Sequence, residues 1–186
     1  MKLYIKNMVC SRCKMAVKAE LEKFGLHFLY LELGEVEIME ELDVPMKSKL
    51  NQSLLSVGFE IIDDKKGRLI EKIKNSIIEL VHHNDENMRI NLSNHIAQKL
   101  NYDYHYLSNL FSEAAGTTIE KYFITQKIEK AKELLIYDEL SLTEISDRLG
   151  YSSQAYLSNQ FKKITGLTPT VYKSLKEHTR QNIEEL

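Results

Sequence analysis

The sequence lacks tryptophan altogether and has only two prolines and two cysteines among its 186 residues. Two cysteines are too few for a disulfide framework, which excludes a small disulfide-stapled scaffold. No apolar run approaches the roughly 18 residues that a membrane span needs, and the N-terminus lacks the apolar stretch of a signal peptide. We therefore expect a cytoplasmic protein that makes no membrane contact.

Neither sign of charge dominates, because 25 basic residues accompany 27 acidic ones and the net charge is −2. Residues 1–64 carry a net charge of −3, and residues 65–186 carry +1. A nucleic-acid site would therefore have to be a local basic patch. The best candidate is the segment 162–180, which has one acid, Glu177, and the basic residues Lys162, Lys163, Lys173, Lys176 and Arg180.

The first 64 residues contain strand and helix signals in the order βαββαβ. Residues 3–6 alternate with period two, and residues 28–33 and 35–39 predict a hairpin at Gly34. Helical spacing predicts a first helix through Val17, Leu21 and Phe24, and a second that opens at Asp43-Val44-Pro45 with the apolar face Met46, Leu50, Leu54 and Val57. With a last strand at 59–62, this order predicts a ferredoxin-like, two-layer α+β domain.

From Gly67 onward the strand signals stop and the pattern is helical. Within Leu69–Val81, isoleucines and leucines recur at steps of three and four, a stripe better suited to packing inside the molecule than to a coiled coil: Ile70, Ile73, Ile77 and Leu80. We place the boundary near residues 64–67, which predicts domains at 1–66 and 67–186.

The second half of the chain contains an internal repeat. Residues 107–111, Leu-Ser-Asn-Leu-Phe, recur fifty residues later as Leu-Ser-Asn-Gln-Phe at 157–161. Each copy predicts a short helix, a tight turn and a second helix, at 92–100 and 143–149 for the short helices. Asn101 and Gly150 suit the turns, whereas Asp103 and Ser152 or Ser153 suit the caps that follow. This is the layout of a helix-turn-helix, here present twice.

A helix without proline or glycine is predicted between the copies, at residues 118–137. Its length of roughly 30 Å approaches the spacing of about 34 Å between successive major grooves on one face of B-DNA. The predicted all-α domain thus has two helix-turn-helix motifs joined by a long linker helix.

A family resemblance rests on three stretches of this half. They are residues 140–151, Leu-Ser-Leu-Thr-Glu-Ile-Ser-Asp-Arg-Leu-Gly-Tyr, then Phe161-Lys162-Lys163 and Gly166-Leu167-Thr168-Pro169. Residues 68–176 resemble the DNA-binding domain of the AraC/XylS family of bacterial transcription regulators, although that family favours arginine where Lys127 stands. The resemblance implies seven helices, the first at 69–83, and sequence-specific binding to double-stranded promoter DNA.

Helical faces select the candidate DNA-reading residues. In the first reading helix Leu107, Leu110 and Phe111 are predicted core and Tyr104 is predicted to face outward. In the second reading helix Tyr156, Leu157 and Phe161 are predicted core. Together with the resemblance, this leaves His105, Ser108, Asn109, Gln154, Ser158, Asn159 and Lys162 as the predicted DNA-binding residues. Asparagine and glutamine pair bidentately with adenine, and the proposed base-reading positions offer no arginine for guanine, so we expect A·T pairs to be favoured.

The two cysteines lie between the first strand and the first helix, in Met8-Val9-Cys10-Ser11-Arg12-Cys13. A helix N-terminus and Arg12 are expected to lower the thiol pKa values and favour thiolates. Two thiolates suit Cu(I) or another soft metal ion, whereas zinc usually needs four ligands. Three interpretations of Cys10 and Cys13 stay open: a metal site, a redox pair, and an inherited loop without a ligand.

The first 64 residues also resemble the heavy-metal-associated domain of copper chaperones and metal-pumping ATPases. The resemblance rests on the βαββαβ order, the Met-x-Cys-x-x-Cys motif and the closing Gly58-Phe59; Asn7 departs from it, because a glycine is usual there. The resemblance implies that Cys10 and Cys13 bind a soft metal ion such as Cu(I).

Together, these features predict a DNA-binding transcription regulator that responds to a soft metal ion, and not an enzyme, because the sequence has no nucleophile elbow, P-loop or dinucleotide motif. The alternatives are a redox-sensing N-terminal domain, a domain that serves only dimerisation or partner docking, and a metal carrier. The sequence leaves open whether the chain forms a homodimer.

Overall fold

The computed structural model describes residues 1–83, 90–137 and 139–174. It divides into two compact units, Met1–Asn75 and Ser76–Leu186, each with a core of its own. Of the basic patch proposed above, Lys176 and Arg180 lie outside the described residues.

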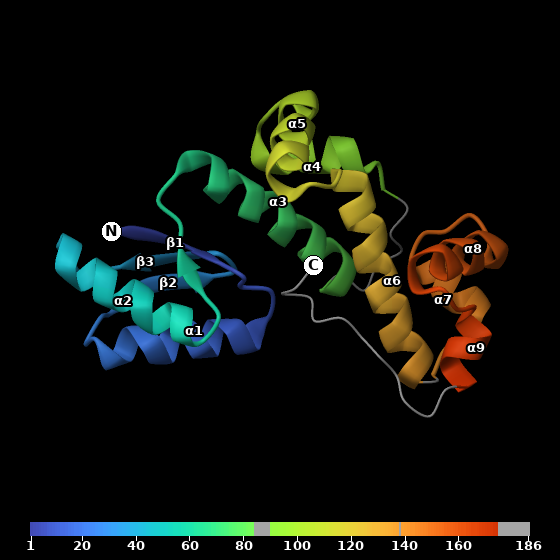
Figure 1. The fold of residues 1–186 in the computed structure, drawn as a ribbon, viewed down its shortest axis with the longest axis horizontal. Coiled ribbons are helices and arrows are strands. Elements are labelled where there is room, and N and C mark those ends of the chain that lie inside the picture. Colours follow the sequence, from blue (N-terminus) through green and yellow to red (C-terminus); the bar gives the residue numbers. More distant parts are fainter. Residues whose placement is uncertain (84–89, 138, 175–186) are drawn as a thin grey trace. The chain divides into compact units, whose positions relative to one another are not determined.

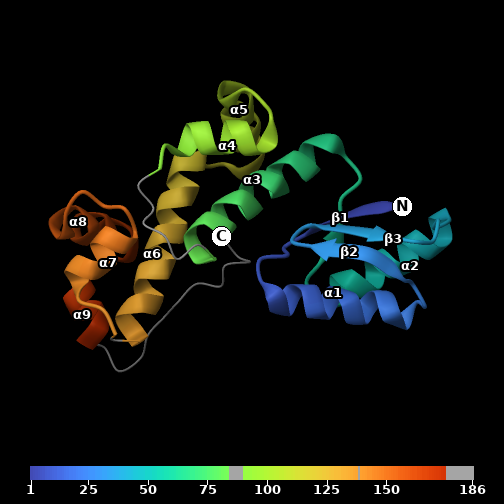
Figure 2. The same cartoon turned by 180° about the vertical axis from the view of Figure 1, so that it is seen from behind.

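The first unit is built on a four-stranded antiparallel sheet with the strand order β2-β3-β1-β4. The strands are β1 (Lys2–Lys6), β2 (Phe28–Glu32), β3 (Glu35–Ile38) and β4 (Glu60–Ile61). Helices α1 (Ser11–Lys23) and α2 (Val44–Ser56) lie together against one face of this sheet (Figures 1 and 2). The predicted βαββαβ order is confirmed.

Alternation along the strands sends one set of side chains to the helices. Leu3 and Ile5 of β1 are almost fully buried, as are Val36 and Ile38 of β3. The helices contribute Val17, Leu21, Leu50 and Leu54 to the same core. Such burial of aliphatic side chains is the main stabilising term of a small domain.

The apolar face predicted for α2 is only half right. Leu50 and Leu54 are fully buried, but Met46 and Val57 are 36% and 42% exposed. Both lie at the ends of the helix, Met46 in its first turn and Val57 just past its last residue. Helical spacing puts a residue on the correct side of a helix, but whether a neighbour covers that position depends on the tertiary packing.

The opposite face of the sheet is met by the first half of α3 (Lys65–His82). Arg68 and Lys72 place their cationic groups 4.7 and 5.2 Å from the centroid of the Tyr4 ring on β1. Asn75 Nδ2 donates to the carbonyl of Leu33 at 3.2 Å. These contacts explain why the two compact units divide between Asn75 and Ser76, although the change in sequence pattern near residues 64–67 coincides with the start of α3.

The second unit consists of helices in the residues that the structure describes. After α3 come α4 (Leu92–Leu100), α5 (Tyr104–Ala115), α6 (Ile119–Tyr137), α7 (Leu142–Arg148), α8 (Gln154–Thr165) and α9 (Pro169–Ser174). Counted from α3, these are the seven helices that the family resemblance implies. The linker helix predicted at 118–137 is α6, which begins one residue later.

Helix α6 connects the two helical pairs α4–α5 and α7–α8 (Figures 1 and 2). On the first pair, Phe111 of α5 meets Tyr122 of α6 edge-on, with ring centroids 5.6 Å apart. On the second pair, the fully buried Phe161 of α8 meets Tyr172 of α9 at 5.4 Å. The second helix of each pair therefore has a firmly packed inner side.

Candidate nucleic-acid interface

Each helical pair is closed by a tight turn and a capped second helix. Asn101 takes the left-handed conformation (φ 56°), and the side chain of Asp103 then accepts from the amide of Tyr106. In the second pair, Gly150 takes this conformation (φ 64°), and Ser153 rather than Ser152 caps α8 by accepting from the amide of Tyr156. The predicted turns are confirmed, and each orients a second helix by local hydrogen bonds.

The outer side of α5 carries the first set of predicted DNA-binding residues. His105 and Asn109 are exposed one turn apart, and Asn109 Nδ2 lies 3.2 Å from His105 Nε2. Ser108 is half-buried between them. Leu107, Leu110 and Phe111 are buried on the inner side, as predicted.

The outer side of α8 carries the second set. Gln154, Asn159 and Lys162 are exposed, whereas Ser158 is half-buried. The side-chain oxygen of Gln154 accepts from the hydroxyl of Thr143 at 3.0 Å, which ties the start of α8 to α7. Among the described residues Asn159 makes no side-chain hydrogen bond, so its amide is available to a base edge.

The prediction that Tyr156 belongs to the core is wrong, because the side chain is 50% exposed. Its ring rests edge-on against the buried Tyr151 at 5.8 Å, and its hydroxyl accepts from the amide of Gln160 at 3.1 Å. Tyr104, predicted to face outward, is half-buried, and its hydroxyl donates to Glu120. Burial and this carboxylate raise the pKa of the Tyr104 hydroxyl.

A pair of exposed tyrosines, which are not among the predicted DNA-binding residues, occupies equivalent positions of the two reading helices. Tyr106 is 47% exposed and Tyr156 is 50% exposed, and they stand fifty residues apart, as the repeat does. Tyrosine hydroxyls commonly contact DNA phosphates. The repeat offset was the signal that would have found them.

Known proteins share this arrangement. A family model described as a helix-turn-helix domain matches residues 96–174. The C-terminal domain of AraT, a response regulator from Geobacillus stearothermophilus, has 27% identity and a TM-score of 0.51, and the match covers 64% of this chain and 97% of that one. The family match thus shows a helix-turn-helix domain at residues 96–174 of this chain.

Curated transcriptional regulators match this chain as well. An HTH-type transcriptional regulator of Bacillus subtilis, described as uncharacterized, is 24% identical over 148 residues, which make up 80% of this chain and 18% of that protein. The xylose operon regulatory protein of Escherichia coli K12 is 41% identical over 69 residues, or 37% of this chain and 18% of its own length. The chain thus spans less than a fifth of either relative.

The two cysteines lie at the N-terminus of α1, in the first compact unit. Cys10 is the N-cap residue and is partly exposed, whereas Cys13 lies in the first turn and is 4% exposed. The two sulfur atoms are 3.5 Å apart and not joined by a disulfide. Within the described residues no third histidine, cysteine or carboxylate completes a metal-binding group with them.

The expectation that both thiols would have lowered pKa values is wrong for Cys13. Burial raises the pKa of the Cys13 thiol to about 11, and the amides that favour its thiolate do not offset this. Helix-terminal position favours an anion, but removal of the sulfur from water disfavours it more strongly. The linear sequence could not show this, because the burial of Cys13 is a property of the folded structure.

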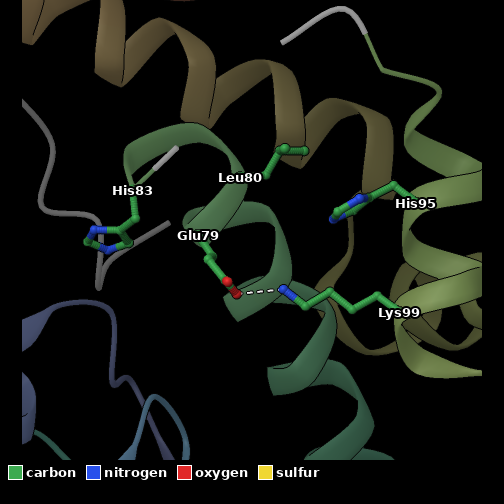
Figure 3. Close-up of a pocket in the computed structure, with 5 residues that line it drawn as sticks. All are labelled: Glu79, Leu80, His83, His95 and Lys99. Carbon is green, nitrogen blue, oxygen red and sulfur yellow. Dashed lines mark hydrogen bonds and ion pairs between the residues drawn. The ribbon is translucent and has the colours of Figure 1, made fainter. Parts of the chain in front are cut away.

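One cavity of about 200 Å³ lies in the second unit, between α3 and α4 (Figure 3). Its lining residues are Glu79, Leu80, His83, His95 and Lys99, and Glu79 forms an ion pair with Lys99 across it at 2.5 Å. Burial lowers the pKa of His95, whose Nε2 is buried without a hydrogen-bond partner. The histidine is therefore held in its neutral form.

In the described part of the chain, no helix combines the length and the apolar character that a membrane crossing requires.

Proposed function

We propose that this chain is a sequence-specific DNA-binding transcription regulator that reads double-stranded DNA with α5 and α8. The observation that carries the proposal is the duplicated geometry: two helix-turn-helix pairs on one helix, α6, each with a polar outer face on its second helix. A second helix of this kind enters the major groove in helix-turn-helix proteins. The relatives named above, an HTH-type regulator and an operon regulatory protein, support the same function.

Direct base reading would come from His105, Ser108, Asn109, Gln154, Ser158 and Asn159, and Lys162 would contact a phosphate. Asparagine and glutamine amides can pair with both the N6 and N7 atoms of adenine. Asn109 would have to exchange its contact with His105 for one with a base, whereas Asn159 is available without such a change. We therefore expect the stronger sequence preference in the half-site read by α8.

The test is selection of bound sequences from random double-stranded DNA with the purified full chain. An enriched motif with two half-sites about one helical turn apart is expected. Asn159→Ala should weaken binding by about 1–3 kcal/mol and relax one position of the motif. Glu113→Ala is the matched control, since Glu113 is an exposed residue of α5 outside the predicted reading set. Selection that enriches no sequence over bulk DNA would refute the proposal.

A second proposal concerns the first unit: Cys10 and Cys13 bind a soft metal ion such as Cu(I), and the ion modulates DNA binding. The separation of 3.5 Å between the sulfurs supports it, and so does the resemblance to heavy-metal-associated domains. Two thiolates without further ligands suit Cu(I) better than zinc. The structure equally accommodates the redox alternative, in which the same two sulfurs form a disulfide.

The experiment measures DNA affinity of the full chain with Cu(I), with oxidant, and with neither, and compares it with the Cys10→Ser/Cys13→Ser variant. A change in affinity with Cu(I) that the variant lacks supports metal sensing, and a change only with oxidant supports the redox alternative. Identical affinity in every arm would leave DNA binding intact and remove both sensing proposals, in favour of dimerisation or partner docking.

A further inference from the structure

Lys127, in the middle of α6, is a buried residue whose ammonium group lies over aromatic rings. The side chain is 7% exposed, and Nζ lies 3.9 Å from the ring centroid of Tyr151 and 5.3 Å from that of Phe123. Among the described residues no carboxylate or other acceptor pairs with it. Lys132, the other buried lysine of this helix, is by contrast paired with Glu129 at 2.6 Å.

A buried cation without a carboxylate partner destabilises the folded state. Burial lowers the pKa of Lys127 from 10.5 to about 8. Because the folded pKa is the lower one, the charged form carries this cost below about pH 8, and the cost disappears as pH rises through the unfolded value. A methionine would fill the same space without it, so a lysine at this position calls for a reason other than stability.

The contacts of Lys127 lead towards the reading helix. Tyr151 follows Gly150 in the turn between α7 and α8, and its ring also packs against the Tyr156 ring, at a centroid distance of 5.8 Å and an interplanar angle of 67°. Tyr156 belongs to the first turn of α8 and also accepts from Gln160. An ammonium group and two rings thus connect the middle of α6 to the outer side of α8.

The first copy of the repeat lacks an ammonium group over its corresponding tyrosine, within the described residues. Tyr102, the counterpart of Tyr151, is 37% exposed and stacks on Tyr106 at 5.9 Å, whereas Tyr151 is 3% exposed. Within the described residues no cation lies over the Tyr102 ring. The cation–π contact therefore occurs only in the second helix-turn-helix pair of the described residues.

We propose that Lys127 is a positioning residue for DNA binding, whose ammonium holds Tyr151 against α6 and thereby sets the first turn of α8 for the duplex. The inference rests on the proposed DNA-binding function. A desolvated cation–π contact is strong enough to decide between two side-chain arrangements of a turn.

Lys127→Met in the full chain tests the proposal on a DNA site selected by the wild type. Affinity should fall up to about tenfold. The thermal midpoint should stay equal or rise, because a buried charge has been replaced by an apolar side chain of similar length. The salt dependence of binding should keep its slope, because a buried ammonium does not touch phosphate.

Two control variants separate positioning from simple charge loss. Lys162→Met, on the exposed side of α8, should reduce the slope of log affinity against log salt by about 0.9. Lys121→Met removes an exposed charge from α6 itself and should leave the affinity for the selected site within about twofold of the wild type.

Lys127→Arg adds a pH profile. Because arginine stays charged, the DNA affinity of the Lys127→Arg variant should be constant from pH 7 to 9, whereas the DNA affinity of the wild type should fall across that range. Within the part of the chain that the structure describes, the Phe123 ring on α6 and the Tyr151 ring in the α7–α8 turn face the ammonium. Burial raises the pKa of Tyr151, so this hydroxyl remains neutral.

Wild-type affinity in Lys127→Met, or a parallel fall in its affinity and its thermal midpoint, would overturn the positioning role while DNA binding stands. A wild type that selects no DNA sequence would overturn the proposed function itself.

Discussion

Cys13 should react with an alkylating reagent at least about a hundred times more slowly in the folded protein than in the unfolded chain. The thiolate is the reactive form, and burial raises the pKa of this thiol from 9.0 to about 11. At neutral pH each unit of pKa lowers the thiolate fraction tenfold, so two units give about a hundredfold. The low exposure of the side chain, 4%, slows the reaction further.

The assay is pulsed labelling with iodoacetamide, followed by mass spectrometry of the peptide that contains Cys13. The same peptide from denatured protein is the reference. The neighbouring Cys10 thiol also raises the pKa of Cys13 through its hydrogen bond, but burial is the larger cause. Cys10→Ser should therefore recover only a small part of the lost reactivity.

Equal labelling rates in the folded and denatured protein would refute the assignment of a buried, protonated Cys13. The raised pKa also predicts how stability depends on pH. Because the folded value is the higher one, this thiol costs no stability below about pH 9, and stability is lost as pH rises through about 11. A Cu(I) ion that binds here must displace the Cys13 proton, so its apparent affinity should increase with pH.

Three further predictions follow from single residues. Burial lowers the pKa of His95, so the free energy of unfolding should fall as pH drops below 6.5 towards that lowered value. Urea unfolding should show a smaller loss of this free energy between pH 7 and pH 5 in His95→Leu than in the wild type. In the same assay Gly150→Ala should lower the free energy of unfolding by about 1–2 kcal/mol, because alanine is strained at the φ of 64° that Gly150 adopts. Asn101→Gly should leave the free energy of unfolding unchanged, and equal effects of the two variants would contradict the left-handed turns. Phe161→Ala, at a fully buried position of α8, should cost about 3–5 kcal/mol, and a loss below 1 kcal/mol would contradict its place in the core.

The elements of the fold were predictable wherever their signals lie close together in the sequence. Asp43 caps α2 by accepting from the amide of Met46, three residues away. Ser141 and Glu144 form a reciprocal capping box at the start of α7. Hydrogen bonds of this range depend on a few neighbouring residues, so a linear pattern identifies them. The repeat similarly indicated both reading helices, and the absence of proline and glycine between its copies indicated the length of α6.

Several side-chain environments were not predictable from the linear pattern. Tyr156 occupies a position expected in the core of α8 but is half exposed, and Tyr104 is half-buried although it was expected to face outward. The burial of Cys13 overrides the local influence of the helix terminus on its pKa. Each of these depends on which distant segment covers the side chain, and solvent exclusion is not a property of the local sequence.

Spacing, caps and the fifty-residue repeat were thus sufficient to predict a βαββαβ unit, two helix-turn-helix pairs and the helix faces that carry the candidate DNA-reading residues. Only the folded structure showed that α3 packs on the sheet with its first half, and that the buried Lys127 lies over the Tyr151 and Phe123 rings with no carboxylate partner among the described residues. Hydrogen bonds and periodicity act over a few residues, whereas burial, cation–π contacts and pKa shifts arise between residues that only the fold brings together.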